Sequence, residues 1–142
     1  MKKIIYLVLL CLITSLAVQA QEKKSEWNGC DRYDFTFKDR QATVVVPKKA
    51  AKGTPWIWRP AFFDAFPSVD KALLEKGFHI VYYDVTHLYG SPRAVSLGTE
   101  FYKDITDRYG LSPKVTLEGF SRGGLFAFNW AAQNTDKVAC IY

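Results

Sequence analysis

Polar and apolar residues alternate along the first strand-like segments of the chain, with the period of two that is typical of half-buried strands. Residues 32–38 show this alternation, and residues 42–46 form a second apolar segment that Pro47 closes. A short polar turn separates the two segments, so the pattern predicts an antiparallel hairpin. Residues 54–58 are predicted to add a third, short strand, and residues 21–29 to form a flexible lead-in.

From residue 68 onward the pattern alternates between helix and strand. Residues 78–85 are almost continuously apolar, as expected of a parallel strand that is covered on both faces. The predicted order is helix 68–76, strand 78–85, helix 92–109, strand 114–120, helix 122–133 and strand 137–142. Together with the hairpin, this order predicts an α/β fold with a doubly wound, mostly parallel sheet. Such sheets place their active groups at the carboxyl ends of the strands.

Capping residues mark the predicted helix boundaries. Ser68 is predicted to cap the first helix, which Gly77 ends. Ser91 is predicted to cap the second helix, where Pro92 stands at the first helical position, and Gly110 to end it. The second helix carries an apolar stripe at every fourth residue: Leu97, Phe101, Ile105 and Tyr109.

Residues 1–20 have the three-part composition of a secretory signal peptide. A basic start is followed by an unbroken apolar run at residues 4–13, and Val18 and Ala20 stand at the −3 and −1 positions of a cleavage site. A transmembrane anchor needs about 20 apolar residues, and this run is shorter. We therefore expect cleavage, which leaves residues 21–142 as one secreted or periplasmic domain without stable membrane insertion.

The composition is that of an ordinary globular domain, with 49% apolar and 23% charged residues. The net charge of +5 falls to +3 without Lys2 and Lys3, and the remaining basic residues are scattered among acidic ones. Nucleic-acid binding needs Lys and Arg clustered on one face, so it is not expected. An exported protein could join Cys30 and Cys140 in a disulfide. We favour two unpaired thiols, with Cys140 packed as a small hydrophobic residue.

The most informative segment is Gly119–Gly124, which reads Gly-Phe-Ser-Arg-Gly-Gly and lies between a predicted strand and a predicted helix. It fits the pattern G-x-S-x-G, in which a sharp strand-to-helix turn lifts the serine hydroxyl above the sheet. Gly119 and Gly123 leave room where such a turn closes, and the backbone N–H of Arg122 is placed to donate to a developing oxyanion. Ser121 is therefore predicted to be a nucleophile. The alternative is a glycine-rich turn whose solvent-facing serine has no catalytic role.

With this turn, residues 30–142 resemble the α/β-hydrolase family in strand order and at the serine. Trp58–Phe62 occupy the place of the family's oxyanion loop, and Tyr83–Pro92 resemble the loop after its fourth strand. The resemblance implies an α/β-hydrolase fold and a serine hydrolase, without a cofactor, that cleaves an ester or amide through an acyl-enzyme on Ser121. Within the family, the chain looks most like secreted bacterial esterases or prolyl-oligopeptidase-like enzymes.

The chain departs from the family pattern at two points. Pro60 has no N–H to donate, so the second oxyanion donor is expected from Ala61 or Phe62. The family orders its triad as serine, acid and histidine, whereas the 21 residues after Ser121 contain Asp136 and no histidine. We therefore expect this chain to be the truncated amino-terminal part of a longer enzyme, inactive by itself, whose triad acid and base lie beyond it.

Other residues near the predicted site allow more than one interpretation. His79 is expected to be structural within its strand, and His87 to line the active face without acting as the base. Arg59, like Arg122, is predicted to contact a carboxylate or other anionic group of the substrate, or else to form a surface ion pair. Phe62 is predicted to contact a sugar ring or acyl group, or else to pack in the core. No cysteines or carboxylates stand at metal-ligand spacing, so no metal site is expected.

Small-molecule, glycan and peptide esters or amides all fit this interpretation as substrates. A second class of function is a non-catalytic periplasmic binding protein that keeps the hydrolase scaffold. An Asp or Glu and a His on successive strand ends downstream of Ser121 would favour the enzyme, and their absence would favour the binding protein.

Overall fold

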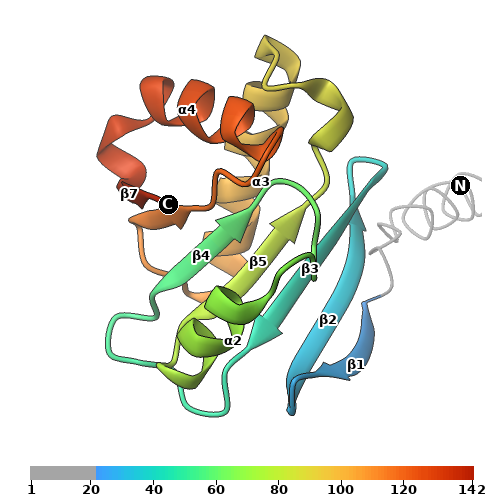
Figure 1. Cartoon of the computed structure of the whole chain (residues 1–142), viewed down its shortest axis with the longest axis vertical. Coiled ribbons are helices and arrows are strands. Elements are labelled where there is room, and N and C mark those ends of the chain that lie inside the picture. The colour runs from blue at the N-terminus through green and yellow to red at the C-terminus, as the bar shows by residue number, and fades with distance from the viewer. Residues whose placement is uncertain (1–21) are drawn as a thin grey trace, which may run out of the picture.

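The computed structural model describes residues 22–142, so the predicted signal peptide lies outside the described part of the chain. A seven-stranded sheet forms the centre of the molecule, with the strand order β1-β2-β3-β5-β4-β6-β7 (Figure 1). In chain order the elements are β1 (Lys23–Trp27), β2 (Cys30–Phe37), β3 (Arg40–Val46), β4 (Trp56–Arg59), α2 (Ser68–Glu75), β5 (His79–Tyr83), the short helix η1 (Thr86–Leu88), α3 (Pro92–Tyr109), β6 (Val115–Leu117), α4 (Gly123–Gln133), the short helix η2 (Thr135–Lys137) and β7 (Val138–Ile141).

The sheet is parallel on one side and antiparallel on the other. β4, β5, β6 and β7 pair in parallel, whereas β1, β2 and β3 join β5 through antiparallel pairs. β2 and β3 are the predicted hairpin, and the alternation of strands and helices after it follows the predicted order. The predicted α/β sheet with an amino-terminal antiparallel hairpin is therefore confirmed.

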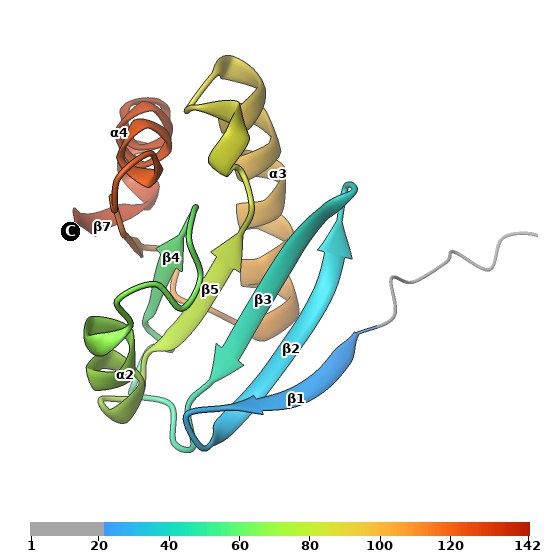
Figure 2. The ribbon, with the colours of Figure 1, turned by 45° about the vertical axis from the view of Figure 1, so that its right-hand side comes forward.

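The flexible lead-in predicted at residues 21–29 is wrong for residues 22–29, because Lys23–Trp27 form β1 at the edge of the sheet (Figure 2). Asn28 and Gly29 close the two-residue turn between β1 and β2, with φ angles of 50° and 74°. Positive φ at both positions is what a type I′ hairpin turn requires, and Asn-Gly is a preferred sequence for it. β1 is polar and mostly exposed, so its hydrophobic pattern is weak, and the Asn-Gly pair is the sequence signal that identifies this hairpin.

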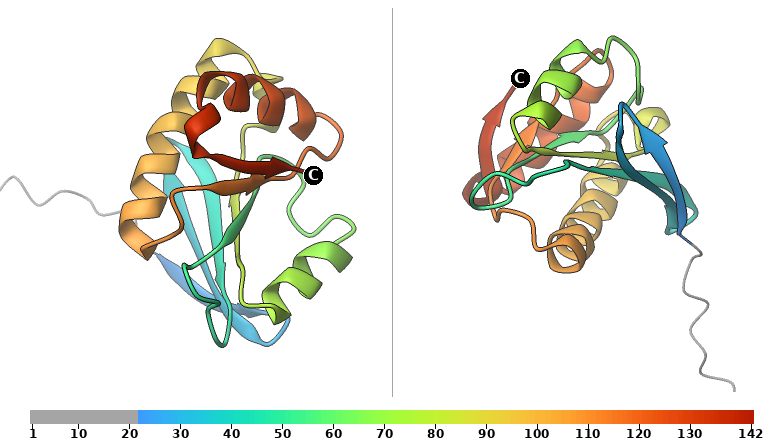
Figure 3. Two further views of the ribbon diagram at one scale, coloured as in Figure 1. Left: turned by 90° about the vertical axis from the view of Figure 1, so that its left-hand side faces the viewer. Right: turned by 90° about the horizontal axis from the view of Figure 1, so that it is seen from below.

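Two hydrophobic clusters lie on opposite faces of the sheet. α3 and α4 cover the face on which Trp58 of β4 is buried. α2 covers the other face, where Leu74 packs with Ile57 and Ile80. Trp58 and Ile57 are neighbours in β4, so their side chains point to opposite faces. Figure 3 shows α2 and α3 on opposite sides of the sheet. Within residues 22–142, no helix is long and apolar enough to cross a membrane.

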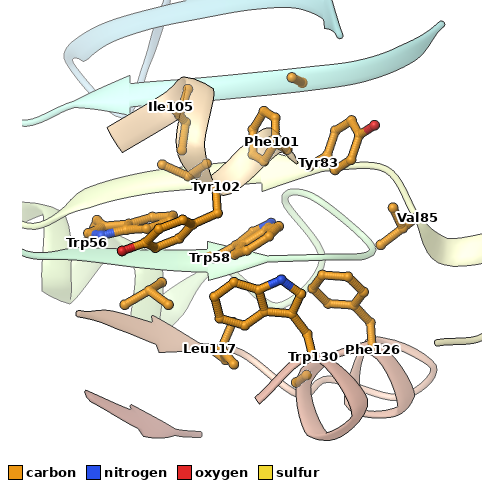
Figure 4. Packing of buried hydrophobic residues seen from close by; sticks show 14 of the residues in the cluster. Trp56, Trp58, Tyr83, Val85, Phe101, Tyr102, Ile105, Leu117, Phe126 and Trp130 are labelled. Carbon is orange, nitrogen blue, oxygen red and sulfur yellow. The ribbon is translucent and has the colours of Figure 1, made fainter. Parts of the chain in front are cut away.

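Trp58 lies among aromatic side chains of both α3 and α4 (Figure 4). Its ring centroid lies 5.6 Å from that of Phe101 in α3, and 5.1 Å and 5.2 Å from those of Phe126 and Trp130 in α4. Gly98 of α3 allows this close packing, since a Cβ at Gly98 would lie 2.5 Å from the Phe126 ring. These contacts hold α4 against β4, and so fix the helix that follows Ser121.

The helix boundaries agree with the sequence at α3 and differ at α2. The Ser91 hydroxyl accepts a backbone N–H of the first turn of α3 at 3.4 Å, and Gly110 ends the helix with a φ of 60°. Ser68 does not cap α2 but is its first residue. Pro67 takes the cap position because its carbonyl already accepts the first helical hydrogen bond, from the N–H of Lys71 at 3.0 Å.

Cys30 and Cys140 are free thiols in the described part of the chain. They lie in β2 and β7, with four strands between them in the sheet. Cys30 is buried within the cluster under α2, whereas Cys140 is exposed. The expected packing of Cys140 is not seen within residues 22–142, where β7 is the outermost strand and its central residues are uncovered.

Candidate active site

The carboxyl ends of β4, β5 and β6 lie side by side along one edge of the sheet, because the three strands are parallel neighbours. The loops that leave these strands are residues 60–67, 84–91 and 118–122. The first loop carries Ala61 and Phe62, the candidates for the second oxyanion donor, and the third carries Ser121 and Arg122. The strand order therefore places the predicted site where open parallel sheets bind their ligands.

Ser121 has a φ of 51°, in the left-handed region that residues other than glycine seldom adopt. Its side chain is exposed at the tip of the turn between β6 and α4. Hydrogen bonds hold the turn on both sides: the N–H of Gly119 donates to the Tyr142 carbonyl at 2.7 Å, and the N–H of Gly124 to the Ser121 carbonyl at 3.0 Å. A left-handed serine costs free energy and persists only where its surroundings fix it.

Two glycines of the turn, Gly123 and Gly124, allow neighbouring backbone to approach closely, and the partner of Gly119 differs from the prediction. The residue facing Gly119 is Gly124, not Gly123: a Cβ at Gly124 would lie 2.9 Å from the Gly119 carbonyl oxygen. Gly123 faces the loop after β4, where a Cβ would lie 3.3 Å from Pro60 Cγ and 3.5 Å from Ala61 Cβ. Gly123 thus brings the predicted oxyanion loop against the start of α4.

Three backbone N–H groups are available beside the turn. Those of Arg122, Ala61 and Phe62 donate to no acceptor within residues 22–142. Arg122 stands at the N-cap of α4, where a helix presents unpaired N–H groups and a partial positive charge. The predicted oxyanion donors therefore have free N–H groups, on a turn and a loop that touch at Gly123.

The loop after β4 carries three further residues with positive φ. Phe62, Asp64 and Phe66 have φ angles of 55°, 66° and 52°. The Phe62 and Phe66 rings pack edge-on against Phe120, with centroids 5.9 Å and 5.6 Å away. Phe62 thus lies next to the residue that precedes Ser121, at the surface rather than in either hydrophobic cluster.

Arg59, the last residue of β4, is 1% exposed, which corrects the expectation that it points into an open site. Its guanidinium donates to the Phe62 and Ala65 carbonyls at 3.2 Å and 2.9 Å and forms an ion pair with Asp70 of α2. It also lies 3.3 Å from Glu118, directly after β6. Both terminal nitrogens of the Arg59 guanidinium therefore have protein partners, which fix the strained loop from beneath.

Asp70 and Glu118 share this single cation. Both carboxyl groups are buried beside the same guanidinium. Burial and the neighbouring Asp70 carboxylate raise the pKa of Glu118 to about 7, and burial also raises the pKa of Asp70. The sequence reasoning missed this cluster. Its signal was a charged residue at the end of each of two buried strands, Arg59 and Glu118.

Two hollows flank the nucleophile turn. One, of about 420 Å³, lies between the turn and the start of α2 and is lined in part by Phe66, Val69, Phe120 and Ser121. The second, of about 350 Å³, lies beside the loop after β5. Its lining is more polar: Gln41, Phe62, Phe63, Tyr82, Asp84, Thr86, His87 and Arg122. The site therefore has a more apolar side and a more polar side.

Neither histidine of the described chain hydrogen-bonds to Ser121. His79 is the first residue of β5, at the opposite end of the sheet from the turn, and burial lowers its pKa. It is buried within its strand, as predicted. His87 is exposed in η1 and lines the polar hollow. Asp136 precedes β7 and so also lies at the opposite end from Ser121. Residues 22–142 hold no cluster of three or more potential metal ligands.

The chain matches a protein family and several solved structures. The family model described as the alpha/beta hydrolase fold matches residues 59–142. Lipase A of Candida antarctica, in its closed state, superimposes with a TM-score of 0.54 and 18% identity over 84% of this chain and 39% of the lipase. Epoxide hydrolase A of Mycobacterium thermoresistibile has a TM-score of 0.50 and 19% identity over 87% of this chain and 38% of that enzyme.

A bacterial membrane phospholipase A, described as a virulence factor, has a TM-score of 0.51 and 17% identity over 99% of this chain and 51% of its own. At this level of identity the likeness establishes the fold. The chain spans about two-fifths to one-half of the length of these three structures. No curated protein matches the sequence.

Proposed function

Because the chain belongs to the α/β-hydrolase family, we propose that it carries the nucleophile of a serine hydrolase that cleaves an ester or amide bond. Family and fold support a hydrolytic activity. The similar structures are a lipase, an epoxide hydrolase and a phospholipase, so this fold accommodates more than one kind of hydrolysis. The choice of acyl transfer therefore rests on the residues of the turn.

The observation that carries the proposal is the conformation of Ser121. An exposed serine is held at a φ of 51° where a strand ends and a helix begins, beside backbone N–H groups without acceptors in residues 22–142. Left-handed residues other than glycine cost on the order of 1–3 kcal/mol and cluster at active sites. Lys38, Asp39 and Thr54 also have a positive φ, in turns and loops that only connect strands. What sets Ser121 apart is its place at a strand end beside free N–H groups.

The geometry supports an acyl-transfer mechanism. The Ser121 Oγ attacks the carbonyl carbon of the substrate while its proton passes to a base. The N–H of Arg122, with that of Ala61 or Phe62, stabilises the negative charge that develops on the carbonyl oxygen. The alcohol or amine leaves, and water then attacks the acyl-enzyme and releases the acid.

The base and its acid partner are proposed to come from outside residues 22–142. His79 and Asp136 lie at the far end of the sheet, and His87 does not contact Ser121. The order of serine, acid and histidine in the family places both partners after the nucleophile. The chain's coverage of only part of each similar structure leaves room for such segments.

Substrate and compartment complete the proposal. A small-molecule, glycan or peptide ester or amide binds across the turn, in the two hollows beside Ser121. The signal-peptide pattern of residues 1–20 supports export to the periplasm or the medium.

Hydrolysis of 4-nitrophenyl esters tests this function. The assay uses the full-length protein, which includes the segments proposed to follow residue 142. The Ser121→Ala variant is expected to lose on the order of 10⁴–10⁶ in kcat, as other serine hydrolases do without their nucleophile. Ser96→Ala, which removes an exposed serine of α3, is the matched control and should retain wild-type turnover. Turnover by Ser121→Ala equal to wild type would reject Ser121 as nucleophile. No turnover by wild type would favour a non-catalytic binding protein.

A further inference from the structure

The side chain of Arg122 lies between two aromatic rings. Its guanidinium carbon is 5.3 Å from the centre of the Phe62 ring and 5.5 Å from that of Tyr89. Its Nη1 also donates to the Tyr89 hydroxyl at 3.3 Å. Such flanking rings hold a guanidinium in a defined place without neutralising its charge.

The loop that carries Tyr89 is fixed by α4. A Cβ on the next residue, Gly90, would collide with the Leu125 carbonyl, so the loop after β5 lies directly on the helix backbone. The Asn129 side chain donates to the Gly90 carbonyl at 2.8 Å. Phe62 is held from the other side, because Arg59 binds its carbonyl. The backbone segments that carry the two rings are therefore placed by the fold before any ligand binds.

Arg122 has no carboxylate partner in the described part of the chain. The guanidinium of Arg59, by contrast, forms ion pairs with Asp70 and Glu118. Asp84 is the acidic residue of the polar hollow, and its Oδ1 accepts the N–H of Thr86 at 3.1 Å. The Arg122 guanidinium therefore keeps donors for an external acceptor, next in sequence to the nucleophile.

We propose that the Arg122 guanidinium binds a carboxylate of the substrate, within a few bonds of the carbonyl group that Ser121 attacks. This inference rests on the proposed function and adds the class of substrate: an ester or amide that carries a negative charge near the scissile bond. The carboxylate enters the polar hollow, which His87 and Gln41 also line, and the uncharged part of the substrate lies in the hollow beside Phe66 and Phe120. Asp84 repels the anion, so the guanidinium must supply the attraction.

Two pairs of esters of matched size test this charge preference on the full-length protein. For the acyl side, mono-4-nitrophenyl succinate is compared with 4-nitrophenyl levulinate, which has a methyl ketone in place of the carboxylate. For the alcohol side, 3-acetoxybenzoate is compared with 3-acetoxybenzamide. The measured quantity is the ratio of kcat/KM for the anionic ester to kcat/KM for its neutral partner.

Wild type is expected to favour the anionic member of one pair, and Arg122→Gln to lower that ratio roughly tenfold, as the loss of a charge-assisted hydrogen bond predicts. Arg122→Lys, which keeps the charge, should restore part of the preference for the anionic ester. Lys52→Gln removes the same charge at an exposed site in the loop before β4 and should leave the ratio unchanged. If Arg122→Gln leaves the anionic-to-neutral ratio of kcat/KM unaltered in both pairs, the inference about Arg122 is overturned, whereas the proposed function is not. Wild type that hydrolyses none of the four esters overturns the proposed function with it.

Discussion

Arg59 and Glu118 meet in the interior at 3.3 Å, one at the end of β4 and the other directly after β6. The pair links the loop that carries Ala61 and Phe62 to the turn that carries Ser121 and Arg122. Asp70 extends the link to α2. Three elements that are distant in sequence are thus joined beneath the candidate site by one guanidinium.

Arg59→Met is expected to destabilise the protein by about 3–5 kcal/mol, because it leaves two buried carboxyl groups without their cation. Arg59→Lys should cost less, since it keeps the charge but cannot reach the same set of acceptors. Urea denaturation measures both. Arg93→Met, at an exposed position of α3, is the control and should change the free energy of unfolding by no more than about 0.5 kcal/mol. Equal stability of Arg59→Met and Arg93→Met would mean that the buried cluster contributes nothing to stability.

Glu118 makes the free energy of unfolding depend on pH. Its pKa is raised to about 7 in the folded state from an ordinary value of 4.5, so between these two pH values the folded protein keeps a proton that the unfolded chain has lost. The contribution is fully present below about pH 4.5 and is lost as the pH rises through about 7. Denaturation from pH 4 to 8 should show a steeper decline in wild type than in Glu118→Gln. Parallel curves for the two proteins would contradict a raised pKa at Glu118.

Ser121 stores backbone strain that glycine would relieve. Glycine adopts a positive φ without the steric cost that a Cβ imposes, whereas alanine bears that cost. Ser121→Gly is therefore expected to be more stable than Ser121→Ala by about 1 kcal/mol, although neither variant retains a nucleophile. Thermal and urea unfolding of the two variants give this difference directly. A more stable alanine variant would show that the left-handed conformation at residue 121 carries no strain.

If the protein is exported, its mature amino terminus can be predicted. The Val18-Gln19-Ala20 pattern predicts that the secreted or periplasmic protein begins at Gln21. The intact mass of protein recovered from the periplasm or the medium tests this. A membrane-retained protein that still begins at Met1 would reject cleavage.

Much of the fold could be predicted from the sequence because its signals are local. The hairpin of β2 and β3, the apolar strand β5 and the capped helix α3 each follow from short patterns. β1 was missed because a polar edge strand has little hydrophobic pattern, although its Asn-Gly turn was visible. Packing of Cys140 was also expected from its apolar segment, whereas within residues 22–142 this residue is exposed on the outermost strand, β7.

The candidate site likewise has a part that could be predicted from the sequence and a part that could not. The Ser121 turn has a local signature, and the structure places it at a strand end with a positive φ. The place of Arg59 depends on partners 11 and 59 positions away in the chain, Asp70 and Glu118, which no local pattern connects. The sequence therefore predicted that Arg59, at a strand end, contacts the substrate. In the fold it is buried, and it holds the loop after β4 through hydrogen bonds.

The covalent product of a fluorophosphonate probe tests the central claim most directly. The full-length protein is treated with the probe, digested and analysed by mass spectrometry to locate the adduct. We predict a single modified residue, Ser121, with labelling abolished in Ser121→Ala and retained in Ser96→Ala. An adduct on another residue, or equal labelling of Ser121→Ala and wild type, would contradict the assignment of Ser121 as the nucleophile.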